Sequence, residues 1–110
     1  VMSRKITQQA IKSFINKQSF FKDNTMVEVT ETSTTLKLFN NPIAGIDYKG
    51  MWISDAGWPT RTTFDRLNGI DGVYVFTKKG QVYLNGFPWD GEKEYVMRTT
   101  HYYTDILKVF

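Results

Sequence analysis

The central part of the chain reads WISDAGWPTRTTFDRLNGI over residues 52–70 and KKGQVYLNGFPWDG over residues 78–91. Short apolar runs alternate here with Gly, Pro, Asn and Asp, a pattern typical of strands joined by tight turns. Thr62-Thr63-Phe64-Asp65 fits a capping box at the start of a short helix over residues 62–68, which Asn68-Gly69 would end in a left-handed cap. This stretch therefore predicts a strand, a short capped helix and a β-hairpin.

An amphipathic helix is predicted at the start of the chain, over residues 4–17. Its apolar residues recur at the helical period and form one stripe, with Ser3 as the expected N-cap. The stripe consists of Ile6, Ala10, Ile11, Phe14 and Ile15. We expect Phe20 and Phe21 to anchor the exit of this helix in the core.

The remaining segments predict strands. Residues 26–30 and 34–39 alternate as a hairpin, residues 43–46 and 51–54 give two more strands, and residues 72–77 and 81–84 form a second hairpin. Residues 95–97 could add a strand, and Tyr103, Ile106, Leu107 and Phe110 have the spacing of a C-terminal helix. The predicted fold is α+β: an N-terminal helix, an antiparallel sheet of about six short strands and a short second helix between strands. We expect residues 1–110 to form a single domain.

Composition excludes several classes of protein. The 110 residues include no cysteine, so disulfides and thiolate metal sites are absent. No apolar run approaches the roughly 18 residues that span a bilayer, so we expect a soluble protein without a membrane partner. Net charge is only +3, whereas aromatic residues make up 15% of the chain. That ring content favours an aromatic core, a binding face, or both.

No catalytic constellation emerges from the sequence. The only histidine, His101, has no metal-ligand partner at a telling spacing, and the acidic residues are scattered. Glycine-rich phosphate loops and a serine in a nucleophile elbow are also lacking. We therefore expect neither an enzyme nor a bound metal or cofactor.

The loop over residues 57–63 is the first candidate binding site. It places hydroxyls, a guanidinium and free amides at a helix N-terminus, an arrangement that attracts anions. Arg61 or Arg66 could pair with a phosphate or carboxylate. The alternative, which we favour, is structural: Thr62 caps the helix and Trp58 packs beneath it.

The aromatic residues of the central stretch are the second candidate. Together with Lys78, Lys79 and Arg66 they could stack unpaired bases, although a mostly structural role is again favoured. An exposed aromatic set on a chain of this modest charge would more often mark a protein interface. The candidate binding residues are Trp58, Thr60, Arg61, Thr62, Thr63, Arg66, Lys78, Lys79 and Trp89.

Several sequence blocks resemble a group of small bacteriophage-encoded proteins. The blocks are AGWxTxTTxxRLN, within residues 56–68, and YLNGxxWDG, over residues 83–91. The resemblance spans about residues 6–91, and residues 92–110 look like an extension. It implies a context, a small phage protein in the host cytoplasm, and carries no activity with it.

The leading hypothesis is a non-enzymatic protein that binds a host or phage macromolecule, as a host-takeover or counter-defence factor would. Its partner is expected to be a protein. The alternatives are a nucleic-acid-binding protein and a protein that sequesters a small anionic ligand or nucleotide. The chain could also form a homodimer, either through the strand edge at residues 74–77 or through the C-terminal apolar stripe.

Overall fold

The computed structural model describes residues 4–98 of the chain. Ser3, His101 and the predicted C-terminal helix lie outside these residues. The elements follow in the order α1 (Lys5–Ile15), β1 (Phe20–Lys22), β2 (Thr25–Val29), β3 (Thr34–Leu38), β4 (Asn41–Asp47), β5 (Gly50–Ile53), α2 (Arg61–Asn68), β6 (Val75–Lys78), β7 (Gln81–Leu84), β8 (Phe87–Pro88) and β9 (Glu94–Arg98).

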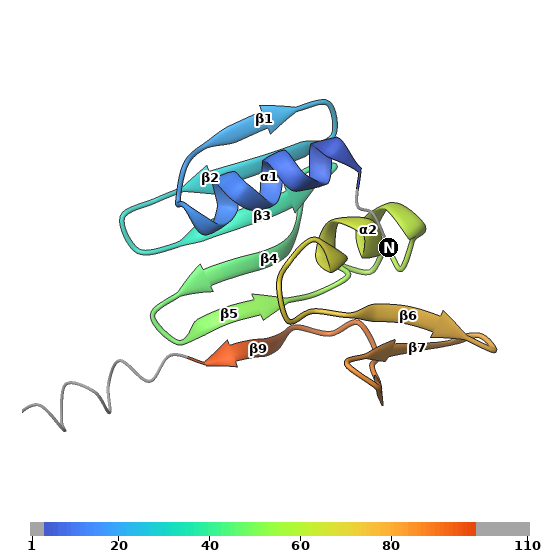
Figure 1. The fold of residues 1–110 in the computed structure, drawn as a ribbon. Coiled ribbons are helices and arrows are strands. Elements are labelled where there is room, and N and C mark those ends of the chain that lie inside the picture. Colours follow the sequence, from blue (N-terminus) through green and yellow to red (C-terminus); the bar gives the residue numbers. More distant parts are fainter. Residues whose placement is uncertain (1–3, 99–110) are drawn as a thin grey trace, which may run out of the picture.

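The strands form two antiparallel sheets (Figure 1). Six strands pair in the order β1-β2-β3-β4-β5-β9, and three form a small sheet in the order β6-β7-β8. The predicted α+β fold is confirmed. The large sheet contains other strands than predicted, however. The hairpin of β6 and β7 belongs to the small sheet, and β1 and β9 are the edge strands of the large one.

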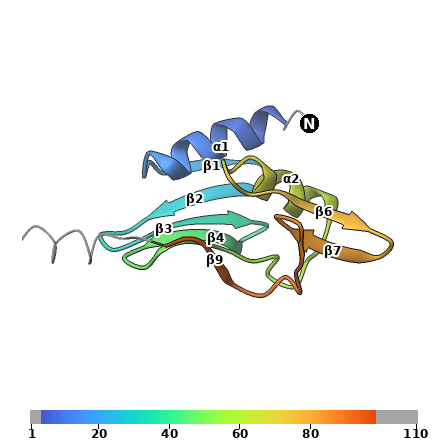
Figure 2. The same cartoon turned by 60° about the horizontal axis from the view of Figure 1, so that its bottom comes forward.

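Both helices lie on the same side of the large sheet, as Figure 2 shows. The residues that β2, β3, β4 and β5 turn towards the helices pair across the strands, with Val27 opposite Leu36 and Ala44 opposite Ile53. These side chains are buried against Ala10, Ile11 and Phe14 of α1. The period-two pattern of the strands thus meets the apolar stripe of the helix in one core.

One expectation about the exit of α1 was wrong. Phe20 packs against the core, but Phe21 is 72% exposed. The reason is strand β1, which the sequence analysis did not predict: successive side chains of a strand point to opposite faces. Phe21 pairs with Met26 of β2 and turns away from the helices.

The helix α2 ends at Asn68 as predicted, but the caps at both of its ends differ from the prediction. Thr60, not Thr62, is the N-cap, and its hydroxyl accepts a hydrogen bond from the amide of Thr63. Gly69 follows the helix with a right-handed φ of −74°. Its lack of a side chain serves close packing instead, because a Cβ there would lie 2.5 Å from Cγ2 of Thr7 in α1.

Phe14 tests how far the core depends on the packing of α1. Its side chain is fully buried, so Phe14→Ala should lower the free energy of unfolding by about 3–5 kcal/mol, through lost burial and the cavity left behind. Urea denaturation would measure this change. Phe21→Ala is the matched control and should change stability by less than about 1 kcal/mol. Equal effects of the two variants would contradict the packing described here.

Candidate binding site

The guanidinium of Arg66 is the polar centre of the molecule. Arg66 belongs to α2 and is only 1% exposed. Its Nη1 donates to Thr7 Oγ1 at 2.7 Å and its Nε to Thr25 Oγ1 at 3.0 Å. The same Nη1 lies 2.9 Å from Asp65 Oδ2, and Nη2 donates to Asn24 Oδ1 at 3.3 Å. One side chain therefore joins α2 to α1, to β2 and to the turn before it.

This cluster needs all its hydrogen bonds, because a buried charge without partners is costly. Burial lowers the pKa of Arg66, and the neighbouring carboxylate of Asp65 opposes that effect. Thr7 also donates to Asp65, so the hydroxyl is both donor and acceptor within the cluster. Among residues 4–98, every buried side-chain nitrogen or oxygen atom has a hydrogen-bond partner.

The structure divides the candidate binding residues into an interior and an exterior group. Arg66, Thr63 and Trp89 are buried, and the indole nitrogen of Trp89 donates to the carbonyl of Glu92. In this conformation a ligand on the surface does not reach them. Thr62 is half-buried, and the exposed residues are Trp58, Thr60, Arg61, Lys78 and Lys79.

The exposed part of the first candidate loop borders a groove of about 750 Å³ between α2 and β6. From the helix side it is lined by Arg61, Phe64 and Asn68, which follow one another at helical spacing along one face of α2. Pro59 and Arg4 complete this wall. We call this cavity the α2–β6 groove.

Aromatic side chains form the opposite wall. The rings of Tyr74 and Phe76 lie 5.1 Å apart, and Phe76 stacks on Tyr83 of β7 at 5.1 Å with an interplanar angle of 12°. Tyr74 is 57% exposed, whereas Val75 on the other face of the strand is buried. Val73 and Val75 therefore belong to the core, and the aromatic rings of this hairpin face outward.

Two arginines give the groove its charge. Neither Arg4 nor Arg61 forms an ion pair or a side-chain hydrogen bond with another residue of the described range 4–98. Asp65, the acid in the groove lining, is already paired with Arg66. The groove therefore combines an aromatic wall with two positive charges that no acid within residues 4–98 pairs with.

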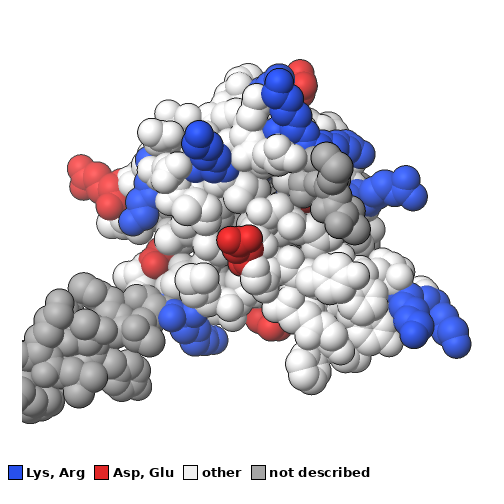
Figure 3. Space-filling model, viewed as in Figure 1, with Lys and Arg blue, Asp and Glu red and all other residues white. Residues whose placement is uncertain are grey.

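Basic residues are otherwise dispersed. Figure 3 shows Lys and Arg side chains around the outline of this face rather than in one patch. Lys78 and Lys79 lie at the tip of the β6–β7 hairpin, where Lys79 and Gly80 both have positive φ. The structure therefore brings Arg61 and the groove together but sets the two lysines at the end of the hairpin.

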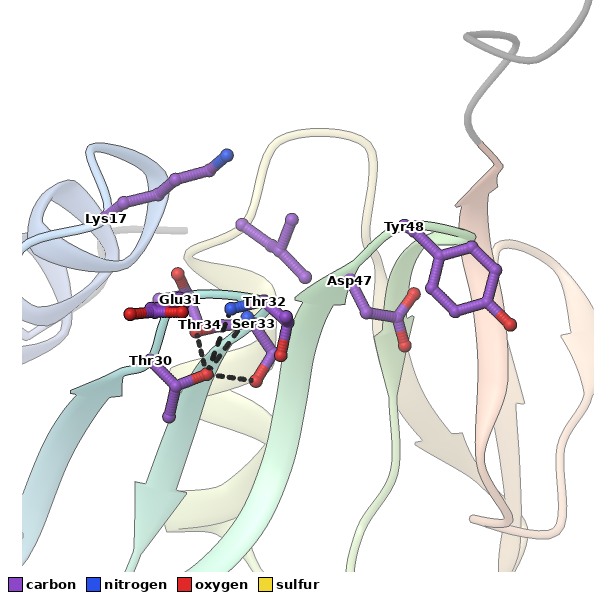
Figure 4. Close-up of a pocket in the computed structure, with 9 residues that line it drawn as sticks. Lys17, Thr30, Glu31, Thr32, Ser33, Thr34, Asp47 and Tyr48 are labelled. Carbon is purple, nitrogen blue, oxygen red and sulfur yellow. Dashed lines mark hydrogen bonds between the residues drawn. The ribbon is translucent and has the colours of Figure 1, made fainter.

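A second pocket, of about 350 Å³, lies at the far end of the large sheet (Figure 4). Lys17 and the turns β2–β3 and β4–β5 line it, so it is rich in hydroxyls. Two of those hydroxyls hold the β2–β3 turn: Thr30 Oγ1 accepts from the amides of Thr32 and Ser33 and bonds the hydroxyl of Ser33. We assign this pocket to turn structure.

Asp47, at the border of this second pocket, is held by Tyr95 of β9. The phenol donates to Asp47 Oδ2 at 2.6 Å. This hydrogen bond is the main cause that raises the pKa of Tyr95 from 10.0 to about 12. Burial alone would raise the pKa of Asp47, but the hydrogen bonds from Tyr95 and Lys49 and the charge of Lys93 lower it.

Residues 4–98 contain no group of three or more His, Cys, Asp or Glu side chains placed to hold a metal ion. In the same range, neither helix has the length and apolar character needed to cross a membrane. Two further carboxylates serve the fold: Asp55 accepts from the amide of Gly57, and Asp90 from that of Glu92.

Sequence comparison defines the class of this chain as a phage protein family. The chain belongs to the Kyanoviridae Gp96 protein family, whose model matches residues 3–107. The resemblance to small phage proteins is thereby confirmed, and most of the stretch set apart as an extension lies within the match. No curated protein and no solved structure matches the chain.

The sequence analysis missed several residues of the groove. Phe64 and Asn68 had a usable signal, since they share a helix face with Arg61. Arg4 had none, because its place in the groove depends on how α1 packs beside α2.

Arg66 and Arg61 form a matched pair for a stability test. Arg66→Ala should lower the free energy of unfolding by about 3 kcal/mol or more, because Thr7, Thr25 and Asp65 lose a shared buried partner. Arg61→Ala, at an exposed position of the same helix, should stay within about 0.5 kcal/mol. Thermal unfolding would compare the two, and equal effects would contradict the structural role of Arg66.

Tyr95 tests the hydrogen bond to Asp47. Absorbance titration should show one tyrosine that ionises near pH 12, and Asp47→Asn should bring it back towards 10. Because the folded-state pKa is raised, the bond adds stability that is complete below pH 10 and is lost as pH rises through about 12. An unchanged titration in Asp47→Asn would refute this assignment.

Proposed function

We propose that this phage protein is a non-enzymatic binding protein that acts in the host cytoplasm by contact between its α2–β6 groove and a host or phage protein. The observation that carries the proposal is the groove itself, with exposed aromatic rings on one wall and, on the other, two arginines that have no ionic partner among residues 4–98. Tyr and Arg are the residues that protein interfaces favour at their centres.

Three carboxylates with partners inside the fold support a role without catalysis. Asp47, Asp55 and Asp65 accept hydrogen bonds that link β4 to β9, fix a loop and complete the Arg66 cluster. Asp65 lines the groove, but its carboxylate is paired with Arg66. A protein of this kind works by stoichiometric contact, as a host-takeover or counter-defence factor would.

Nucleic acid is the second candidate partner. The stack of Tyr74, Phe76 and Tyr83 could receive bases, and the lysines at the hairpin tip could meet phosphates. The dispersed positive charge of Figure 3 favours a protein instead, since nucleic-acid sites usually concentrate it. A site for a small anion has less support, because Arg66 and Thr63 are buried.

The test is a pull-down of the tagged protein from infected-host lysate, with and without nuclease, read by mass spectrometry. We expect a protein partner that survives nuclease and is lost with Tyr74→Ala. Phe87→Ala is the matched control, because Phe87 is an exposed aromatic residue of the same small sheet but does not line the groove. It should retain the partner.

Two results would overturn the proposal. Recovery that disappears with nuclease would indicate a nucleic-acid partner. A partner retained by Tyr74→Ala and lost with Phe87→Ala would place the contact outside the groove. Circular dichroism of both variants would show that the fold is intact, as expected for two side chains that are 57% and 74% exposed.

A further inference from the structure

Strand β6 has a free edge. It pairs with β7 on one side, and it is the end strand of the small sheet. Along a strand of an antiparallel pair, every second residue directs its main-chain N–H and C=O groups to the partner strand, and the residues between direct theirs to the other side. Tyr74 bonds towards β7, since its carbonyl accepts from the amide of Asn85 and its amide donates to the Asn85 side chain. The main-chain groups of Val75 and Thr77 therefore point to the opposite side, towards α2.

The two residues on this edge differ in what they meet. Asn68 of α2 bonds both main-chain groups of Val75: Nδ2 donates to the carbonyl at 2.9 Å, and Oδ1 accepts from the amide at 2.6 Å. The side chain thus imitates a neighbouring strand at that position. Thr77 has no such partner among residues 4–98. Val82, the residue opposite Thr77 on β7, accepts a hydrogen bond at its carbonyl from the amide of Trp89, on the side of β7 away from β6.

This open position borders the α2–β6 groove, which Thr77 also lines. An unpaired strand edge is a ready template for another strand, and an extended peptide can add to it through main-chain hydrogen bonds. The aromatic wall beside it offers a pocket for a side chain of such a peptide. Arg4 and Arg61 offer charge-assisted bonds to carboxylates.

We propose that the groove binds an extended acidic segment of a partner protein, which adds as a strand to β6 by exchanging hydrogen bonds with Thr77. Its carboxylates meet Arg4 and Arg61, and an apolar side chain packs on Tyr74 and Phe76. This inference deepens the proposed function and rests on it. Charge complementarity selects the acidic segment, because no acid of the groove lining is left to neutralise either arginine.

Thr77 allows a test that leaves the hairpin intact. Thr77→Pro replaces the side chain, fixes φ and removes one main-chain donor, the amide at the open edge; the bonds between β6 and β7 stay, because the neighbouring residues make them. Thr77→Val is the matched control, since it changes the side chain but retains the amide. Both variants keep every residue of the aromatic wall.

The probe is a displayed library of random peptides of about ten residues, long enough to cross the groove as a strand. Peptides selected on the wild-type protein should carry Asp or Glu beside an apolar residue. The selected peptides, synthesised with a label, should bind Thr77→Pro roughly tenfold more weakly than the wild-type protein, because one hydrogen bond is lost. They should bind Thr77→Val about as tightly as the wild-type protein. Arg61→Glu should weaken the binding of these peptides more than Thr77→Pro does.

Hydrogen exchange supplies an independent readout. The Thr77 amide should exchange rapidly in the free protein and become protected when a selected peptide is bound, because it gains a main-chain acceptor. Thr77→Pro binding as tightly as wild type, or an amide that stays unprotected, would overturn strand addition. Selection of basic peptides, or binding of single-stranded DNA in place of peptides, would overturn the acidic segment.

The outcome can be separated from that of the proposed function. If the lysate partner is lost with Tyr74→Ala but retained by Thr77→Pro, a protein still binds in the groove and only strand addition fails. If the partner is insensitive to Tyr74→Ala, the groove is not the contact surface and both proposals fail.

Discussion

The fold depends on the buried guanidinium of Arg66. Within residues 4–98 it is the one place where α2, α1, β2 and the turn before β2 share hydrogen bonds, and it keeps a positive charge where the exposed fraction is 1%. A buried charge is tolerated only when its partners are in place. The cluster therefore fixes the position of α2 over the large sheet, and Gly69 permits the close approach of α1 that this position requires.

The position of α2 in turn determines the α2–β6 groove. One face of the helix carries Arg66 and Leu67 into the interior, while another presents Arg61, Phe64 and Asn68 to β6. Asn68 then attaches the small sheet by bonding both main-chain groups of Val75. The short helix that holds the core together thus also forms the cationic wall of the groove. A substitution in α2 therefore affects either stability or the groove, depending on which residue is changed.

Much of the fold follows from local pattern. The alternation of residues 26–30 and 34–39, the stripe of α1 and the Lys79-Gly80 turn each specify their element by periodicity or backbone preference. Strand β1 and the two-residue strand β8 escape such analysis, because they are too short to show a period. The capping box at Thr62 was wrong for a related reason: Thr60 and Thr62 are both suitable caps, and the geometry of the loop decides between them.

The candidate site was predictable only in part. From the sequence alone, the chain is α+β, belongs with small phage proteins and carries a distinctive loop and hairpin, since these properties depend on neighbouring residues. The tertiary structure decided which arginine is buried and which is exposed, and which strand edge is left open. Arg61 and Arg66 lie little more than one helical turn apart in α2. Only the packing of α1 and β2 against α2 buries Arg66 in the core and leaves Arg61 in the groove.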